Sequence, residues 1–579
     1  MNVSKIEIKN FRSIKLCSAN ISGIRALVGE NNSGKSAFLR ALNAFFNYND
    51  EKDHFYLGHH QHTPQSSPRI EISFVDLPDV EKFNEYRNDD ILTLRMTYQP
   101  KKRKRIIEYK KPDRKYSKID GNVIEILNKY ITYVFIPPNR NSAKFMWDEQ
   151  TLLKQLIEAY LKNETSKRDT LSPKFVEAAD YVNKHAFKRI AAITKKFYNL
   201  NQNIDYEIKF EDDISYKNFI NNICFYVTEK NQRYDLSDCG SGIQSLTIIA
   251  LHRAIANLQH NRIILGIEEP ETNLHPQAQK ELVGSIRDMI DEENSNMPSI
   301  ILTTHSTVII DQLGHEQIVL FRKEDDPKRG FVTTVKSVNK NFFSDNNIDE
   351  FRYYQFHNYR NSDFFFARYV IIVESKNESE LIRYFAKQMG IDLDICGISL
   401  INLEGLRNIK YPLDIVKELS IPYLIIVDKD FFVPYLNDDL ENSRNASGFP
   451  KYRYEYKNNS IINDLIKNDR DRDRLLTKLQ KNHSRAMDML EGFSIICMKQ
   501  NLEIDLIASY KACDILYDHL QIDSQSRNQH ELLVNRKKQI KKIENILYVI
   551  ENIPHKNLPN SYKRIKKVMK TIAKTISNK

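Results

Sequence analysis

The chain has 579 residues, of which 41% are hydrophobic and 28% charged, ordinary proportions for a globular protein with room for two to four domains. No apolar run approaches the length of a membrane-spanning helix, and the N-terminus alternates like a strand rather than a signal peptide. The six cysteines form no C-x-x-C pair, which argues against a zinc site or a disulfide framework and fits a cytoplasmic protein.

The net charge of +10 is unevenly distributed along the chain. Residues 536–579 contain thirteen Lys or Arg and two Glu, a balance of +11, so the rest of the chain is close to neutral. A basic tail of this kind suits the phosphate backbone of a nucleic acid. It fits equally well the solvated face of a Lys-rich helix.

The first motif lies between an apolar run ending at Val28 and a helical segment starting at Ala37, and it reads Gly29-Glu30-Asn31-Asn32-Ser33-Gly34-Lys35-Ser36. This is the G-x-x-x-x-G-K-[ST] pattern of a P-loop in strand–loop–helix context. Its backbone N–H groups and the helix N-terminus favour a polyphosphate. We expect Lys35 to reach the β- and γ-phosphates of a nucleoside triphosphate and Ser36 to hold Mg²⁺.

Two polar segments and one helical segment follow before the next nucleotide motif. His54, His59, His60 and His62 lie in a polar stretch without metal-ligand spacing, so a surface loop is the favoured interpretation. The basic run 101–105 is compatible with a DNA contact, but a solvated hairpin is the simpler interpretation. Residues 147–200 interrupt strand-rich sequence with apolar residues at helical spacing, which predicts an insertion that mediates dimerisation or, alternatively, a lid or structural subdomain.

Three later segments complete a nucleotide-binding pattern. A Gly/Ser turn at Ser241 and Gly242 leads into a helix, which is a second cradle for phosphate. The apolar strand 263–267 ends in Glu268 and Glu269, one carboxylate for Mg²⁺ and one to orient water. The strand 300–304 ends in His305, which can contact the γ-phosphate.

With these segments in this order, residues 1 to about 340 resemble an ABC-type ATPase head of the RecF/SMC kind. The resemblance implies that Glu268 takes the Walker B position, that Glu269 is the hydrolytic base and that His305 is the switch histidine. It also implies that the turn at Ser241 and Gly242 acts on the nucleotide of a second head. We therefore expect a homodimer or a higher homo-oligomer, with the insertion at 147–200 supplying contact.

The second half of the chain alternates apolar runs with helical segments. The runs 369–373, 398–403 and 423–427 end in Glu374, Glu404 and the pair Asp428-x-Asp430, respectively. Strand, helix, strand, helix, strand predicts a parallel sheet whose carboxyl ends meet at one edge. Carboxylates gathered there are the hard oxygen ligands that Mg²⁺ or Mn²⁺ prefers.

An acid after the first strand followed by D-x-D resembles a Toprim domain, with Ser375 where that family usually has Gly. An ABC head followed by Toprim resembles the OLD-family nucleases, a group that includes the nuclease subunit of the Gabija antiphage system and OLD-type effectors of some retrons. The metal ligands that the resemblance implies are Glu374, Glu378, Asp428, Asp430 and Asp505, and Glu503 is the alternative to Asp505. The resemblance also implies a further acid at Glu404 and a catalytic Lys at 537 or 538.

The sequence thus predicts an α/β protein in which an ABC-type ATPase domain (1–345, with the insertion) and a linker (346–366) precede a Toprim nuclease domain (367–579) with a basic helical C-terminus. The expected function is an ATP-binding, Mg²⁺- or Mn²⁺-dependent DNA endonuclease that acts in antiphage defence. Its expected defence partner is a UvrD-like helicase, or a reverse transcriptase with its retron RNA/DNA. The alternatives are a nuclease-inactive, SMC/RecF-like, ATP-gated DNA clamp and a topoisomerase or primase.

Overall fold

The structure is a computed structural model, and two compact units, Met1–Ser337 and Val338–Lys579, make up the chain, each with its own hydrophobic core. The described residues are 1–52, 66–99, 102, 104–120, 122–138, 156, 181–197, 204–210, 223–259, 262–291, 299–327, 330–339, 341–348, 362–457 and 459–577. The division after Ser337 assigns the short helix α11 (Phe342–Asp345) to the second unit. The domain limits expected at 345 and 367 stay predictions.

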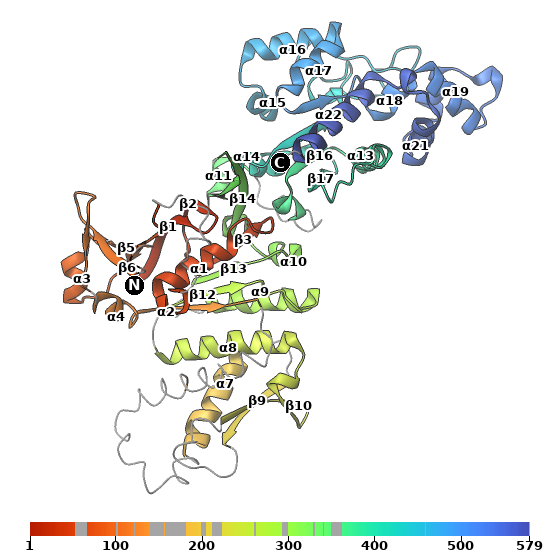
Figure 1. Ribbon diagram of the computed structural model, residues 1–579. Coiled ribbons are helices and arrows are strands. Elements are labelled where there is room, and N and C mark those ends of the chain that lie inside the picture. The colour runs from red at the N-terminus through yellow and green to blue at the C-terminus, as the bar shows by residue number, and fades with distance from the viewer. Residues whose placement is uncertain are drawn as a thin grey trace. The chain divides into compact units, whose positions relative to one another are not determined.

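The first unit is built on a twelve-stranded sheet with the order β7-β6-β5-β4-β1-β2-β15-β14-β3-β13-β12-β8 (Figure 1). The strands β14, β3, β13, β12 and β8 pair in parallel, whereas the strands from β7 to β2 pair antiparallel. The bounds are β1 (Asn2–Phe11), β2 (Ile14–Ala19), β3 (Ile24–Gly29), β4 (Arg69–Val75), β5 (Leu92–Gln99), β6 (Lys104–Lys110), β7 (Tyr116–Lys118), β8 (Ile131–Ile136), β12 (Arg262–Glu268), β13 (Ser299–Thr303), β14 (Ile318–Asp326) and β15 (Gly330–Ser337).

Helices cover the parallel part of this sheet, because its strands are apolar on both faces and would otherwise leave that surface in water. Every residue of β13 is buried, and α1 packs on β3, β8, β12 and β13. The helices of the unit are α1 (Lys35–Phe46), α2 (Tyr48–Glu51), α3 (Glu81–Tyr86), α4 (Asn122–Leu127), α7 (Lys188–Phe197), α8 (Ser241–Gln259), α9 (Pro276–Asp291) and α10 (Thr307–Ile310). The carboxyl ends of β3, β12 and β13 therefore meet where the P-loop enters α1.

The predicted helical insertion lies mostly outside the described residues. Within 147–200 the structure describes only Leu156 and 181–197, which form the short π-helix Asn183–Phe187 and α7. Here α7 packs on α8 and on β9, which with β10 and β11 forms a small antiparallel sheet, β9 (Ile204–Phe210), β10 (Ile223–Glu229) and β11 (Gln232–Asp235). The role of the insertion in dimerisation stays a prediction.

Two sequence hypotheses concern polar stretches of this unit. The histidines 54, 59, 60 and 62 lie outside the described residues. The run 101–105 enters β6, which pairs antiparallel with β5, so its described part belongs to a hairpin. There the Arg105 guanidinium lies over the ring of Tyr48, 4.7 Å from the ring centroid.

The second unit is built on a parallel four-stranded sheet with the order β17-β16-β18-β19. Its strands are β16 (Tyr369–Val373), β17 (Ile398–Asn402), β18 (Tyr423–Val427) and β19 (Ile495–Cys497). Its helices are α11, α13 (Lys376–Gln388), α14 (Lys410–Glu418), α15 (Ser460–Leu465), α16 (Asp469–Lys481), α17 (His483–Glu491), α18 (Leu502–Ile507), α19 (Tyr510–His519), α20 (Lys537–Ile540), α21 (Ile543–Asn552) and α22 (Asn560–Ser577). The three predicted strands are confirmed, whereas β19 is too short to stand out in the sequence.

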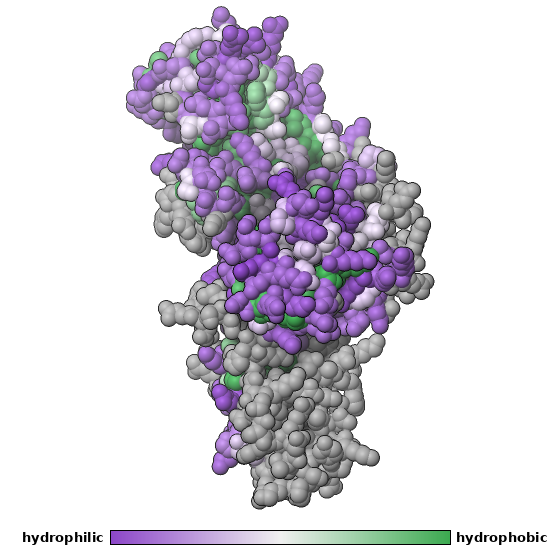
Figure 2. Space-filling model, turned by 90° about the vertical axis from the view of Figure 1, so that its left-hand side faces the viewer, coloured by the Kyte–Doolittle hydropathy of each residue, from purple (hydrophilic) through white to green (hydrophobic). Residues whose placement is uncertain are grey.

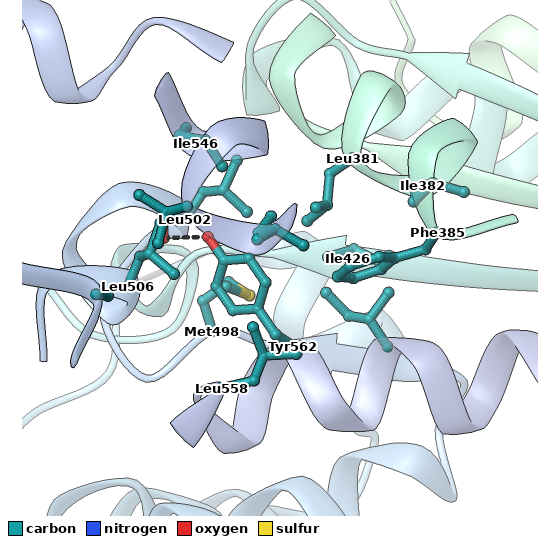
Figure 3. Close-up of a cluster of buried hydrophobic side chains, with 14 of the residues drawn as sticks. Leu381, Ile382, Phe385, Ile426, Met498, Leu502, Leu506, Ile546, Leu558 and Tyr562 are labelled. Atoms are coloured by element: carbon teal, nitrogen blue, oxygen red, sulfur yellow. Dashed lines mark hydrogen bonds between the residues drawn. The ribbon is translucent and has the colours of Figure 1, made fainter. Parts of the chain in front are cut away.

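The basic C-terminal segment contains α20, α21 and, at its end, the amphipathic helix α22. Its apolar face, which includes Tyr562, Ile565 and Met569, is buried in the core of the unit. Figure 3 shows the Tyr562 ring among Leu502, Leu506 and Leu558, with its hydroxyl donating a 2.7 Å hydrogen bond to the Leu502 carbonyl. The helix therefore holds α18 in place while its lysines remain available at the surface.

The surface of the described residues is largely hydrophilic on the face drawn in Figure 2, where hydrophobic side chains appear in scattered patches. Among the helices that the structure describes, none has the length and hydropathy to cross a bilayer.

Candidate nucleotide and metal sites

The P-loop between β3 and α1 needs glycine at two positions for steric reasons. Gly29 has φ +136°, and a Cβ there would lie 2.0 Å from the Phe321 carbonyl oxygen of β14. Gly34 has φ +105°, and a Cβ there would lie 2.7 Å from Thr333 Oγ1. Asn32 also adopts a positive φ, of 59°, which Asn tolerates better than most residues. The loop thus keeps the tight backbone turn on which phosphate binding by N–H groups depends.

Lys35 is folded back onto this loop. Its Nζ donates to the carbonyl oxygens of Gly29 at 2.9 Å and Glu30 at 2.8 Å, and the residue is 5% exposed. Burial lowers the pKa of Lys35 to about 8, although Glu269 acts against the shift. A bound phosphate would replace the two carbonyls and supply the negative charge that a buried ammonium needs.

The ends of β12 and β13 bring the predicted acids and histidine to the P-loop. Glu268 is buried and accepts a hydrogen bond from the Ser36 hydroxyl, while burial raises its pKa. Glu269 has φ +43°, and its N–H donates to Thr303 O at 3.0 Å, which fixes the turn after β12. These contacts put the predicted Walker B acid beside the serine expected to hold Mg²⁺.

His305 is held at the same edge by its backbone. Its N–H donates to Glu271 Oε1 at 2.6 Å, and Thr304 Oγ1 donates to the same oxygen at 2.9 Å. Burial lowers the pKa of His305, and the nearby Lys35 lowers it further. The structure therefore brings together Lys35, Glu269 and His305, as the sequence predicted.

Two arginines beside this site were not singled out from the sequence. Arg12 pairs with Glu51 at 3.8 Å and Arg40 pairs with it at 3.2 Å, and both guanidinium charges act on Glu268. Arg12 lies in the turn after β1 and Arg40 on α1, so no local spacing joins them to Glu268. Only the tertiary fold does.

The predicted signature turn lies apart from the P-loop contacts just described. Ser241 and Gly242 begin α8, and a Cβ on Gly242 would meet Leu274 Cδ2 at 2.9 Å and the Asn273 carbonyl at 3.6 Å. These neighbours belong to the loop between β12 and α9. The expected action of this turn on a second head stays a prediction.

In the second unit, the predicted metal acids gather at the carboxyl edge of the parallel sheet. Glu374 follows β16, and Asp428 and Asp430 follow its neighbour β18. Burial raises the pKa of Asp428 well above its usual value. Repulsion from Glu378, Glu374, Asp430 and Glu503 raises it further, so these five carboxylates share one region. We call them the acid cluster.

Glu374 has the clearest unmet need for a cation. Its Oε2 is buried and has no hydrogen-bond partner among the described residues. Burial, followed by repulsion from Asp430 and Glu378, raises the pKa of Glu374 to about 7. Within the part of the chain that is described, no three side chains form a closed set of metal ligands. Mutual repulsion keeps carboxylates apart while no cation is bound, and a divalent cation between them would offset that repulsion.

Glu378 has a second, structural role at the start of α13. Ser375 caps this helix: its N–H donates to Glu378 Oε2 at 2.9 Å, its hydroxyl donates to the same oxygen, and its Oγ accepts from the Asn377 N–H. This capping box fixes the helix that follows Glu374. Ser375 has φ −136°, so the position expected to be Gly needs no left-handed backbone here.

The two late acids on α18 occupy different environments. Glu503 belongs to the acid cluster, since its charge raises the pKa values of both Asp428 and Glu374. Asp505 is 2% exposed and accepts hydrogen bonds from Lys499 N at 2.8 Å, Gln500 N at 2.7 Å and Ser561 Oγ at 2.7 Å. The sequence preferred Asp505 as the ligand, but the geometry favours the alternative, Glu503, because three donors already occupy the Asp505 carboxylate.

The lysines near the acid cluster also differ from the expected ones. Lys537 forms an ion pair with Glu441, and Lys538 is exposed. Lys541, which was not a candidate, lies 3.5 Å from Glu503 Oε1, and Lys457 lies 3.9 Å from Asp430 Oδ2. Glu404 ends β17 in an exposed position, and its charge is absent from those that act on Glu374 and Asp428.

Comparison with known protein families identifies a domain in each half of the chain. A family model described as "AAA ATPase domain" matches residues 1–145 and 139–310, and one described as "Overcoming lysogenization defect protein-like, TOPRIM domain" matches 365–430. The solved structure of an SmcHead bound to the C-winged helix domain of ScpA aligns with 59% of this chain and 99% of its own, at 15% identity and a TM-score of 0.41.

Three curated relatives carry nuclease names. The "OLD nuclease" of Thermus scotoductus is 23% identical over 449 residues, which span 74% of this chain and 82% of the relative. The "Old nuclease" of Escherichia phage P2 is 20% identical over 74% of this chain and 78% of its own. The "Endonuclease GajA" of Bacillus cereus is 24% identical over 264 residues, 42% of this chain and 38% of its own. Since the ATPase model covers more than half of the chain, the chain belongs to the family described as "AAA ATPase domain", and its second part contains an OLD-like TOPRIM domain, the combination expected of an OLD-type nuclease.

Proposed function

We propose that this protein is a divalent-metal-dependent DNA endonuclease whose cleavage responds to ATP. The observation that carries the proposal is the acid cluster at the carboxyl edge of the second sheet, in which the buried Glu374 Oε2 lacks a hydrogen-bond partner among the described residues. The nuclease names of the relatives support DNA as the substrate.

The ligands in this proposal are the five carboxylates of the acid cluster, and the ions are Mg²⁺ or Mn²⁺, since both accept hard oxygen ligands. Bound there, such ions activate water and stabilise the leaving oxygen of a phosphodiester. Because burial and repulsion raise the pKa of Glu374 to about 7, this carboxyl group is about half protonated at pH 7 in the metal-free protein. Metal binding therefore releases that proton and weakens as the pH falls below 7.

The chain's own cations complete this site. Lys541 beside Glu503 and Lys457 beside Asp430 offset part of the negative charge while the site is free of metal. With the carboxylates held by a metal ion, the ammonium groups of Lys541 and Lys457 would be free to contact the phosphate of the substrate. In this role Lys541 replaces Lys537 as the C-terminal lysine of the site.

ATP binding is assigned to the P-loop of the first unit. Lys35 and Ser36 contact the phosphates and Mg²⁺, Glu268 supports the metal, and Glu269 orients the attacking water beside His305. The turn at Ser241 and Gly242 acts across a head-to-head dimer, with further contact from the insertion. Light scattering tests the assembly: a monomer of 68.1 kDa at micromolar concentration, with and without ATP, would contradict it.

The biological role that we propose is antiphage defence, with a UvrD-like helicase or a reverse transcriptase with its retron RNA/DNA as partner. The OLD-like TOPRIM domain and the GajA name of one relative support this role. Co-purification of the chain with the products of its neighbouring genes tests it, and recovery of neither partner class would contradict it.

The enzymatic proposal is tested with purified full-length protein and supercoiled plasmid. We expect nicking or linearisation with Mg²⁺ or Mn²⁺ and none with EDTA. No cleavage under any metal condition, together with intact ATP and DNA binding, would instead favour an ATP-gated DNA clamp. Religated, topologically altered products would indicate a topoisomerase.

A further inference from the structure

Lys429 stands between the two acids of the Asp-x-Asp pair, but its side chain does not join the acid cluster. The residue is 8% exposed, and its Nζ lies 4.5 Å from the centroid of the Tyr452 ring. The charged or ionisable groups that act on it are Cys497, Lys499 and Asp505, all at or after the end of β19. The side chain is thus directed toward β19 and away from Glu374 and Glu378.

A second lysine lies at the same place. Lys499 follows β19 by two residues and is exposed at the surface, while its backbone N–H is fixed by the Asp505 carboxylate. His483, at the start of α17, has a pKa lowered to about 4, first by burial and then by the charges of both Lys429 and Lys499. The Lys429 N–H donates to the Gln500 carbonyl oxygen at 2.9 Å, so Lys429 lies against the segment that carries Lys499, and both ammonium charges act on His483.

Neither lysine of this pair forms an ion pair with a carboxylate among the described residues of this unit. The lysines that do so there are Lys457, Lys511, Lys537 and Lys541. Asp505, the carboxylate whose charge acts on both lysines, accepts its hydrogen bonds from three other donors. A mostly buried ammonium without a carboxylate partner is costly unless an anion from outside the chain approaches it.

We propose that Lys429 and Lys499 form a subsite that binds the backbone phosphate next to the scissile phosphodiester. The inference rests on the proposed nuclease function of the acid cluster. Consecutive Cα atoms are about 3.8 Å apart, so a phosphate on Lys429 belongs to a nucleotide close to the one held at Asp428 and Asp430. An ammonium recognises phosphate as a point charge, whatever the base sequence.

The aromatic residues between the two places support this division of roles. Tyr435 faces the acids, since Asp430, Asp428, Glu374 and Glu503 all raise its pKa. Its ring lies 5.2 Å from that of Tyr452, which in turn lies under the Lys429 ammonium. The tyrosine pair separates acids from lysines, and the cation–π contact holds Lys429 in the orientation needed for an incoming phosphate.

The test is DNA binding by full-length variants in EDTA over a series of KCl concentrations, measured by fluorescence anisotropy with labelled single-stranded and duplex probes. The variants are Lys429→Met, which keeps the apolar stem, Lys499→Gln, and the double substitution. Lys511→Gln, an exposed lysine on α19, is the matched control. We expect each subsite variant to lower the slope of log K against log salt by about 0.7 to 0.9, and the double variant by about twice that, whereas the control is unchanged.

A purely structural role for these lysines would leave the salt slope unchanged, and this result would overturn the inference. If Lys429→Met fails to fold, the exposed Lys499 decides alone: Lys499→Gln must lower the slope, and Lys499→Arg must restore it. If wild-type protein binds and cuts DNA and the variants show the same slope of log K against log salt, the subsite is refuted but the nuclease proposal stands. Wild-type protein that neither binds nor cuts DNA refutes the nuclease proposal itself.

Discussion

Replacing Glu374 by Gln should stabilise the metal-free protein while it removes cleavage. In the folded chain the pKa of Glu374 is about 7, because burial and then repulsion from Asp430 and Glu378 disfavour its charged form. The folded state therefore holds this proton more tightly than the unfolded state does. Between pH 4.5 and 7 the folded protein loses stability as the pH rises, and above pH 7 the full cost is present.

The size of the effect follows from the same pKa. The difference between about 7 and the usual 4.5, at about 1.4 kcal/mol per pH unit, corresponds to about 3 kcal/mol. We expect Glu374→Gln to gain up to that amount over wild type at pH 8 in EDTA, and the gain to vanish near pH 4.5. Glu418→Gln, an exposed acid at the end of α14, should show no such pH-dependent gain.

The assay is urea unfolding followed by far-ultraviolet circular dichroism, at pH 5 and pH 8, with EDTA or with Mg²⁺. The transition of interest is the one that Mg²⁺ shifts in wild type, since metal at 100 times its dissociation constant stabilises by about 2.7 kcal/mol. A Glu374→Gln variant that is less stable than wild type at pH 8 in EDTA would refute the reasoning. So would a stability difference that does not change between pH 8 and pH 5.

Four further substitutions have distinct expected outcomes. Glu503→Gln should abolish plasmid cleavage without loss of thermal stability. Asp505→Asn should instead destabilise the protein by about 1 to 3 kcal/mol in EDTA, because three donors lose a charged acceptor. The reverse pattern would favour Asp505 as the metal ligand. Lys35→Ala should lose affinity for a fluorescent ATP analogue, and identical wild-type cutting with no nucleotide, ATP or a non-hydrolysable analogue would contradict coupling of the sites. Gly29→Ala should lose nucleotide binding, since its Cβ would lie 2.0 Å from the Phe321 carbonyl oxygen, and retained binding would show that the loop adjusts.

Much of the fold could be predicted because its central strands are long apolar runs that end in functional residues. The runs before Glu268, Glu374 and Asp428 are parallel strands, and neighbouring parallel strands deliver their ends to one edge. The P-loop was equally predictable, because its glycines answer local steric demands at Phe321 and Thr333.

The choice between Glu503 and Asp505 could not be made from sequence. Both lie on α18, and residues two apart on a helix face different sides. Which side meets the acids depends on how α18 docks, and that is fixed by Ser561 and Tyr562 of α22, far along the chain. No local pattern carries this information.

The lysine that we propose for the metal site could not be chosen from the sequence for a similar reason. Lys537, Lys538 and Lys541 lie within five residues and are equivalent by composition. Their partners come from distant segments: Glu441 takes Lys537, while Glu503 meets Lys541. Only the tertiary arrangement shows which of them lies beside the acid cluster.

Plasmid nicking by the Asp428→Asn variant tests most directly whether the acid cluster cuts DNA. Asp428 is repelled by every other member of the cluster, so a neutral side chain there should remove a metal ligand without removing a stabilising contact. With Mg²⁺ or Mn²⁺, we expect wild type and Glu418→Gln to nick supercoiled plasmid and Asp428→Asn to leave it intact, with ATP binding and thermal stability in EDTA retained. If folded Asp428→Asn protein nicks plasmid at the wild-type level, the acid cluster is not the site of cleavage.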